Sequence, residues 1–315
     1  MMGLSIIKKG DDDGATGEEP GASLARGSLG VIIVVALLVA SLPIIMTYTT
    51  LVLTSFANTI VSNPWVKFEF TVENWRLFME GKLAPTSAII YTTTDIIKIV
   101  VNTGIVAFGV MLVVLASSVT SAYAFSRMKF MWRAGMMKLL IVLHAFPGVA
   151  LIVGVYAIYV FIKTYIPRDY DVYYAYVFVI LARASLEIPM AIWILKGFFD
   201  KVPWELEWAT LVDGGSRFTA LRHAVLPIVK PGIAAIAIFA FLAGWEDLIY
   251  VLVFLPPQQK TLATYIESQL GSGSLETTYL PVVAAAGTLY LIPTIAFFVF
   301  TQKLLLETMS GGLKG

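Results

Sequence analysis

The sequence contains no cysteine, which excludes disulfide bonds, zinc–thiolate sites and thiol chemistry. Its two histidines, His144 and His223, lie far apart in the sequence, so we expect no histidine metal site. No nucleotide-binding loop of the form G-x-x-x-x-G-K-S/T occurs, and no polar stretch is long enough to form an enzyme domain. We therefore expect no catalytic residue and no cofactor or metal in this chain, and any energy from ATP must come from another chain.

Charged residues are also scarce. They make up 14% of the 315 residues, whereas 58% are hydrophobic, and the mean hydropathy is +0.82. A soluble domain carries about 25% charged residues. The net charge is only +1, and no basic cluster indicates a nucleic-acid partner. This composition predicts a polytopic membrane protein whose surroundings are the lipid bilayer.

Six stretches are apolar and long enough to cross a bilayer as helices, at about 20 residues each. They are residues 29–53, 97–125, 137–162, 174–198, 232–255 and 281–305. We therefore expect an all-α fold with six transmembrane helices, which form a transmembrane domain over residues 29–306. The polar N-terminal tail, residues 1–28, is typical of disorder. The first apolar stretch starts only at Leu29, so we interpret it as a retained helix and not as a cleaved signal peptide.

If the chain crosses the membrane six times, its lysines and arginines are unevenly divided between the two sides of the membrane. Fourteen lie on the side of both termini and seven on the other side, with Arg183 inside a span. The loop 127–138 alone carries four basic residues and no acid. Because cytoplasmic loops carry an excess of Lys and Arg, we expect both termini and residues 203–227 to be cytoplasmic, in a plasma-membrane protein.

Residues 203–227 are polar and helix-forming, although they lie between two apolar spans. Pro203 suits a first helical turn, and Glu205 and Glu207 follow where the helix dipole favours anions. The Asp-Gly-Gly sequence at 213–215 supplies a helix stop and a turn. So long a connection with helical composition predicts two short helices that form a docking element at the membrane surface. The alternative is a solvated loop with chance helix propensity.

Two charged residues fall inside the fourth span. Arg183 and Glu187 are four residues apart, so they share a helix face and can pair. Charges at membrane depth are costly and usually face a bundle interior or a cavity. Two interpretations remain open at this point, namely a polar substrate pathway and an internal ion pair that locks two helices.

The sequence Trp245-Glu246-Asp247 lies near the centre of the fifth expected span. Adjacent residues on a helix point about 100° apart, so at least one carboxylate must face a cavity, a partner helix or a proton. A hydrogen-bonding cavity for a polar solute fits these residues, and a structural role is the alternative. A proton relay would have to recruit His144 and Glu187.

A proline–glycine pair follows His144 in the third expected span. Pro147 breaks helix hydrogen bonding and predicts a kink at this place. A lone histidine at a kink is more often a structural residue than a ligand, so we interpret His144 as structural.

The segment 203–227 resembles the cytoplasmic signature of permease subunits of type I ABC importers, in particular the shorter, maltose-type subunit of carbohydrate importers. That signature reads approximately P-x-E-L-E-E-A-A-x-x-D-G-A-S, followed after about nine residues by I-x-L-P. The matching residues are Pro203, Glu205, Leu206, Glu207, Ala209, Asp213, Gly214, Ser216, Leu226 and Pro227. Residues 122–127, 245–247 and 307–315 also resemble blocks of this family.

The resemblance implies that residues 203–227 form a coupling element that docks on partner ATPase subunits. The residues expected to serve this contact are Glu205, Glu207, Trp208, Ala209, Asp213, Gly214, Gly215, Leu226 and Pro227. The resemblance also implies a C-terminal tail, residues 307–315, that extends to the ATPase pair with Gly311, Gly312 and Lys314.

The resemblance further implies a second homologous permease, two ATPase subunits that bind ATP and Mg, and an extracytoplasmic solute-binding protein. The function that it implies is translocation of a sugar or oligosaccharide by alternating access. Other interpretations are a proton-coupled secondary carrier, a structural subunit of a membrane enzyme, and an importer of a polyamine, phosphate or iron. Glu246 and Asp247, with Arg183, Glu187 and Trp245, are the candidate residues of the substrate pathway.

The sequence departs from the family signature at several positions. Trp208 stands where the family has the first glutamate of its Glu-Ala-Ala triplet, and Thr210 replaces the second alanine. Ala224 stands at the isoleucine position, and Glu246 replaces an asparagine. The glutamate contact to the ATPase is therefore expected to come from Glu207 or to be absent.

Overall fold

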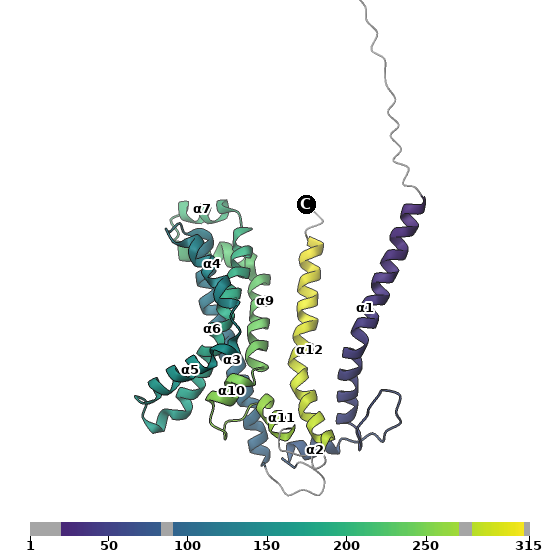
Figure 1. Ribbon diagram of the computed structural model, residues 1–315. Coiled ribbons are helices and arrows are strands. Elements are labelled where there is room, and N and C mark those ends of the chain that lie inside the picture. The colour runs from purple at the N-terminus through teal and green to yellow at the C-terminus, as the bar shows by residue number, and fades with distance from the viewer. Residues whose placement is uncertain (1–19, 83–90, 271–278, 312–315) are drawn as a thin grey trace, which may run out of the picture. The chain divides into compact units, whose positions relative to one another are not determined.

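The computed structural model describes residues 20–82, 91–270 and 279–311, and it confirms the all-α architecture (Figure 1). Side chains are described for 31–82, 91–270 and 279–299. The helices are α1 (Pro20–Ser55), α2 (Glu73–Met79), α3 (Thr93–Arg127), α4 (Arg133–His144), α5 (Gly148–Lys163), η1 (Arg168–Tyr170), α6 (Asp171–Asp200), α7 (Trp204–Val212), α8 (Arg217–Ala220), η2 (Leu221–Val225), α9 (Leu226–Trp245), α10 (Ile249–Phe254), α11 (Leu262–Leu270) and α12 (Leu280–Gly311). The described residues include an isolated antiparallel bridge between Ala57 and Phe70.

Five helices among the described residues are long and apolar enough to cross a membrane. They cover Val31–Ser55, Thr93–Arg127, Arg168–Asp200, Arg217–Trp245 and Leu280–Val299. They correspond to five of the six spans expected from the sequence. A sixth crossing is present if the bent pair of α4 and α5 counts as one span.

The third expected span, 137–162, is broken rather than kinked. Helix α4 ends at His144, α5 begins at Gly148, and the two are bent by 99°. Pro147 holds the extended N-cap position of α5, where proline needs no hydrogen-bond donor. The Pro-Gly pair therefore predicted where the helix is interrupted, but the expectation of one kinked, continuous helix was wrong.

The fifth expected span, 232–255, is also interrupted. Helix α9 ends at Trp245 with Glu246 as its C-cap, and α10 begins only at Ile249. The expectation that Glu246 and Asp247 lie in the middle of a continuous helix was therefore wrong. Both carboxylates lie in the break itself, where the chain direction is no longer set by helix geometry.

The chain divides into two compact units. The first contains α1 as far as Thr50 together with Ser62–Val66, and the described side chains of α1 in it are mostly exposed and apolar, as in a lipid-facing helix. The second contains Leu51–Val61 and the chain from Lys67 onward, and it holds the helices that carry the candidate sites.

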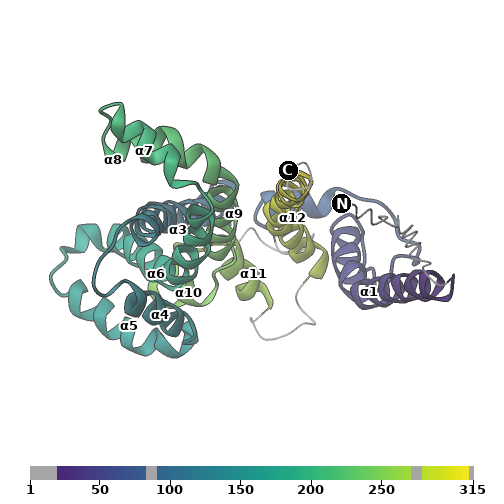
Figure 2. The same ribbon diagram turned by 90° about the horizontal axis from the view of Figure 1, so that it is seen from above.

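Helices α3, α6 and α9 pack side by side and form the centre of the second unit (Figures 1 and 2). Val106, Val110 and Val114 repeat every four residues on α3, and all three are buried in its core. Gly244 of α9 approaches α3 so closely that a Cβ there would lie 2.8 Å from Ala107 Cα. A glycine at this crossing lets the two helices meet, as small residues do in membrane bundles.

The start of α3 is set by a capping box. The Asp95 amide donates to the Thr92 hydroxyl at 3.3 Å, and the Thr92 amide donates to the Asp95 carboxylate at 2.9 Å. These bonds satisfy amides that have no partner within the helix. A second cluster, which includes Phe78 of α2, Tyr265 of α11 and Ala285 of α12, packs beside the end of α9.

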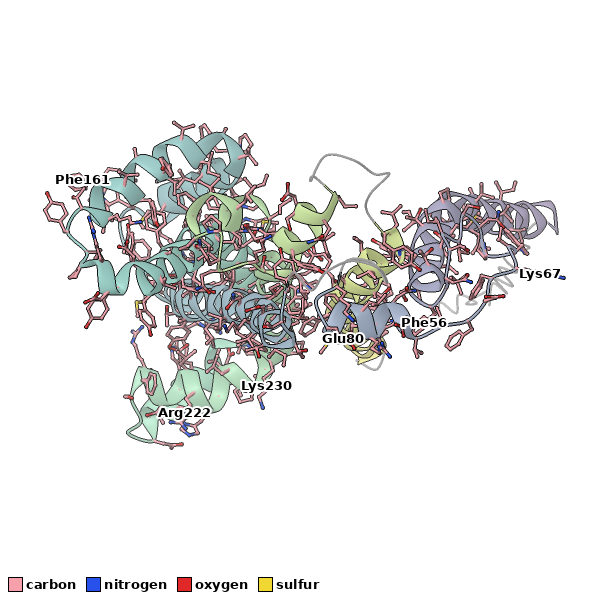
Figure 3. All side chains as sticks on the ribbon, turned by 90° about the horizontal axis from the view of Figure 1, so that it is seen from below. Phe56, Lys67, Glu80, Phe161, Arg222 and Lys230 are labelled. Atoms are coloured by element: carbon pink, nitrogen blue, oxygen red, sulfur yellow. The ribbon has the colours of Figure 1, made fainter. Side chains whose placement is uncertain are left out.

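Exposed side chains mark the periphery of the second unit. Arg222 projects from η2, Lys230 projects from the start of α9, and Phe161 points outward from α5 (Figure 3). Because Phe161 is apolar and 64% exposed, α5 offers a surface suited to lipid or to a partner chain.

Candidate functional site

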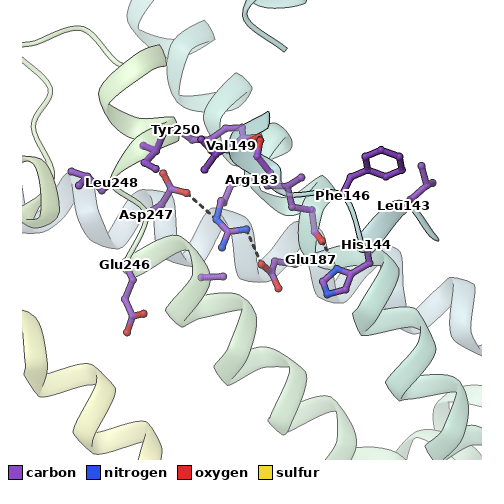
Figure 4. Close-up of a pocket in the computed structure, with 14 residues that line it drawn as sticks. Leu143, His144, Phe146, Val149, Arg183, Glu187, Glu246, Asp247, Leu248 and Tyr250 are labelled. Atoms are coloured by element: carbon purple, nitrogen blue, oxygen red, sulfur yellow. Dashed lines mark hydrogen bonds and ion pairs between the residues drawn. The ribbon is translucent and has the colours of Figure 1, made fainter. Parts of the chain in front are cut away.

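Arg183 of α6 pairs with two carboxylates inside the helix bundle (Figure 4). Its Nη1 donates to Glu187 Oε1 at 2.7 Å, and its Nε lies 2.8 Å from Asp247 Oδ2. The pairing of Arg183 with Glu187 expected from their spacing is thus confirmed. The pairing with Asp247 was missed, because it depends on how α6 packs against the break after α9.

Asp247 also organises the break in which it lies. Its Oδ1 accepts a hydrogen bond from the Val251 amide at 3.1 Å, so the carboxylate satisfies a free amide at the start of α10. The hydroxyl of Tyr250 donates to the Gly148 carbonyl at 2.9 Å, at the start of α5. Two helix breaks, one before α5 and one before α10, therefore meet beside Arg183.

A cavity of about 580 Å³ opens where the two breaks meet (Figure 4). Its polar lining consists of His144, Arg183, Glu187, Glu246, Asp247 and Tyr250. A neighbouring cavity of about 480 Å³ shares His144, Glu187 and Glu246 and continues along α6 and α9. A volume of this size suits a small polar ligand, and broken membrane helices commonly form such sites.

The lining of the larger cavity carries more carboxylates than cations. Arg183 is paired with both Glu187 and Asp247, while Glu246 is exposed and accepts a hydrogen bond from the Thr294 hydroxyl at 3.2 Å. Ionised carboxylates are strong acceptors for hydroxyl groups. The cavity is therefore suited to a ligand with many hydroxyls and without negative charge.

His144 and Trp245 have structural contacts. His144 Nδ1 lies 3.2 Å from the Leu186 carbonyl oxygen, although the ring also lines both cavities. Trp245 donates from its indole nitrogen to the Tyr290 carbonyl at 3.0 Å and is 8% exposed. Trp245 was expected in the substrate pathway, but it anchors α9 to α12 and is absent from the lining of both cavities.

The polar segment after α6 forms the expected helix and glycine turn. Helix α7 ends at Val212 with Asp213 as its C-cap, and Gly214 follows with φ 84°, a left-handed conformation that glycine adopts most readily. The Ser216 hydroxyl accepts from the Thr219 amide at 3.1 Å and caps α8. The expectation of a separate second short helix was wrong. Helix α8 continues through a π-helical turn into α9, and Leu226 and Pro227 are the first residues of α9.

Most candidate coupling residues of this segment are exposed. Glu205, Trp208 and Ala209 on α7 are exposed, as are Asp213 and Gly214 at its end, while Gly215 is half-buried. Trp208 is 58% exposed at the position where the signature has a glutamate. An aromatic ring therefore takes the place of a charge on the outward surface of α7.

Glu207 does not face outward. Its side chain is 2% exposed, its Oε1 accepts from the Tyr123 hydroxyl at 2.7 Å, and its Oε2 lies 3.3 Å from Arg127 Nε. The expectation that Glu207 offers its carboxylate to an ATPase is therefore not met in this structure, because Arg127 and Tyr123 of the same chain hold it. The exposed carboxylate in the first turn of α7 is that of Glu205.

The candidate tail residues lie at the edge of the described chain. Gly311 is the last residue of α12, whereas Gly312 and Lys314 lie outside the described residues. No metal-binding group of three or more His, Cys, Asp or Glu side chains occurs among the residues that the structure describes.

Known proteins resemble this chain in sequence and in fold. No protein-family model matches it. It is 31% identical over 200 residues to the sulfoquinovosyl glycerol transport system permease protein SmoH of Agrobacterium fabrum, over 63% of this chain and 66% of that protein. It is 30% identical over 216 residues to the maltose/maltodextrin transport system permease protein MalG of Escherichia coli, over 67% of this chain and 69% of that protein.

The fold is similar to a chain of a bacterial ABC transporter involved in the import of the acidic polysaccharide alginate. The TM-score is 0.64, and the match covers 89% of this chain and 97% of that chain at 16% sequence identity. This likeness concerns the fold alone, whereas the identity to MalG concerns the sequence. The chain therefore belongs to the family of permease subunits of carbohydrate ABC importers.

Proposed function

We propose that this chain is one of two homologous permease subunits of an ATP-driven importer, and that it carries a sugar or oligosaccharide across the plasma membrane. The observation that supports this most is the connection between the cavity and the docking element. Helix α6 carries Arg183, and three residues separate its end from α7. Helix α9 starts directly after the η2 turn and ends two residues before Asp247. A displacement of α7 is thus passed to both walls of the cavity.

The energy comes from two partner ATPase subunits, which bind ATP and Mg. The sequence has no nucleotide-binding loop, and α7 presents Leu206 and Trp208 as exposed apolar side chains on a polar connection. Exposed apolar groups of this kind are typical of protein contacts. The uneven distribution of Lys and Arg supports a cytoplasmic location for α7 and both termini, where ATP is available.

The substrate is a sugar, delivered by an extracytoplasmic solute-binding protein. The names of the relatives specify sulfoquinovosyl glycerol for SmoH and maltose or maltodextrin for MalG. The carboxylates of Glu187, Glu246 and Asp247 line the cavity and suit the hydroxyls of a carbohydrate. Their excess over Arg183 favours a neutral sugar over an anionic one.

A proton-coupled carrier is the second candidate, since the cavity contains carboxylates and a histidine. Its relay would use Glu246, Asp247, Glu187 and His144. Arg183 holds Asp247 and Glu187, Glu246 accepts a hydrogen bond from Thr294, and His144 is bonded to the Leu186 carbonyl. Each of these groups therefore has a partner within the chain. This arrangement favours the importer.

Purification of the chain from its native membrane tests the proposal. We expect a second six-span permease and an ATPase with a nucleotide-binding loop to co-purify, and the associated binding protein to retain a sugar that mass spectrometry identifies. Recovery of the chain without any ATPase, under detergent conditions that keep other ABC complexes intact, would count against it.

A further inference from the structure

A buried ion pair connects α7 to the end of α3. The side chains of Arg127 and Glu207 are 1% and 2% exposed, and Arg127 Nε lies 3.3 Å from Glu207 Oε2. The Tyr123 hydroxyl, one helical turn before Arg127, donates to the other oxygen of Glu207 at 2.7 Å. Both contacts on α3 thus converge on one carboxylate of α7.

Arg127 also holds the connection that leads into α7. Its Nη2 donates to the Val202 carbonyl at 2.6 Å, and its guanidinium carbon lies 4.5 Å from the centre of the Trp204 ring. Stacking of a guanidinium on an aromatic face adds to the attraction. The contacts with Val202, Trp204 and Glu207 lie at three separate points, so they fix both the position of α7 and its rotation about its own axis.

A buried ion pair is a costly way to hold two helices together. Removing two charges from water costs several kcal/mol per ion, and well-packed apolar residues are often equally stabilising or better. The best-attested benefit of such a pair is a unique register between the elements that it joins. A fixed register is needed where a helix must transmit a displacement.

We propose that Tyr123, Arg127 and Glu207 form a clamp that makes α7 and the adjoining end of α3 move as one rigid body. A displacement of α7 then reaches the cavity through α3 as well as through α6 and α9. The three residues are positioning residues, because they act on the cavity through helices. This inference rests on the proposed function, in which ATPase subunits displace α7.

The clamp assigns Glu207 a role different from that of an ATPase contact. A carboxylate that is held by Arg127 and Tyr123 keeps α7 in place, while Glu205 and Trp208 remain exposed for a partner. Glu207 of the clamp and the exposed Trp208 are therefore adjacent on α7 and point about 100° apart around the helix.

Spin-label distances test the clamp directly, because the chain has no cysteine of its own. Cysteines are placed at Met128, the C-cap of α3, and at Val212, the last residue of α7, which are 40% and 85% exposed. The double-labelled chain is measured in the purified complex, without nucleotide and with a non-hydrolysable ATP analogue and Mg. We expect a single narrow distance that the nucleotide leaves unchanged.

Two variants complete the test. Glu207→Gln weakens both contacts and should abolish the single narrow distance, whereas Tyr123→Phe removes one hydrogen bond and should broaden it less. Asp171→Asn is the control, because it weakens a partly exposed ion pair of 3.5 Å with Lys163 on a different connection. This control should keep the narrow distance.

The outcomes separate the clamp from the proposed function. A nucleotide-dependent change of the distance in the unaltered chain would overturn the clamp, as would narrow distances in both variants. If the Glu207→Gln chain does not assemble into the complex, the distance distribution of Tyr123→Phe decides, and a narrow distance in that variant would overturn the clamp. If the proposed function is wrong, the wild-type complex will show no ATP-dependent uptake. Uptake is not part of the distance comparison, so the two failures can be told apart.

Discussion

At the scale of residues, Asp247 and Glu246 are neighbours with different surroundings. Asp247 is held by Arg183 at 2.8 Å and caps α10, whereas Glu246 is exposed and bonded to Thr294 at 3.2 Å. A charge whose partner is removed inside a bundle is strongly destabilising, and an exposed hydrogen bond contributes much less. The two carboxylates should therefore respond differently to neutralisation.

We expect Asp247→Asn to destabilise the protein by about 3 kcal/mol, because Arg183 keeps its charge and loses a carboxylate. Glu246→Gln should leave folding intact and change apparent sugar affinity by about 1 kcal/mol, because an acceptor oxygen remains. Thermal unfolding in detergent and concentration-dependent uptake measure the two effects. Equal effects of the two variants on stability would contradict the roles assigned here.

Some of these contacts were predictable from the sequence and others were not. The pairing of Arg183 with Glu187 follows from a spacing of four residues on one helix, which local geometry fixes. The pairing of Arg183 with Asp247 joins residues far apart in the chain, and it depends on packing. The inward orientation of Glu207 was missed for the same reason, because its partner Arg127 is on another helix.

At the scale of elements, the break between α4 and α5 is marked by Pro147 and Gly148, whereas the break between α9 and α10 has no such mark. Residues 246–248 contain neither proline nor glycine, so the sequence predicted a continuous helix there. The Asp247 carboxylate stabilises this break by accepting from the Val251 amide, a tertiary arrangement that periodicity does not reveal.

The turn after α7 provides a test of the docking element. Gly214 has φ 84°, which proline cannot adopt, so Gly214→Pro should distort the turn and uncouple ATP hydrolysis from uptake. Gly197→Ala in α6 is the control, because a Cβ there meets nothing within 4 Å. Sugar-stimulated ATPase activity of the reconstituted complex is the measurement. Normal stimulation together with normal uptake in Gly214→Pro would refute the coupling role of this turn.

The crossing of α3 and α9 provides a second test at this scale. A Cβ on Gly244 would lie 2.8 Å from Ala107 Cα, so Gly244→Ala forces two backbones apart and should cost about 1–3 kcal/mol. Gly104→Ala on α3 is the control, because its Cβ meets nothing within 4 Å. Thermal unfolding of the purified chain measures both. A Gly244→Ala variant as stable as the control would show that the two helices separate easily.

At the scale of the whole molecule, the sequence predicted the five apolar spanning helices among the described residues, and a sixth span if the bent pair of α4 and α5 counts as one, because apolar length and helix content are local properties. The orientation in the membrane remains a prediction from Lys and Arg. Cysteines introduced singly at Arg217 and Gln258 should react with an impermeant thiol reagent from the cytoplasmic and the external side, respectively. Labelling of the cysteine at position 217 from outside would reverse the assigned topology.

The source of energy is the central claim at this scale. The cavity carboxylates have partners within the chain, and α7 joins both helices that hold the cavity, so transport should depend on the ATPases and not on a proton gradient. The measurement uses vesicles that contain the complex and a fixed ATP concentration. It follows their uptake of the sugar that the binding protein retains. We predict uptake that requires ATP and persists when a protonophore is added. Loss of uptake on dissipation of the proton gradient, while ATP stays constant, would contradict the account.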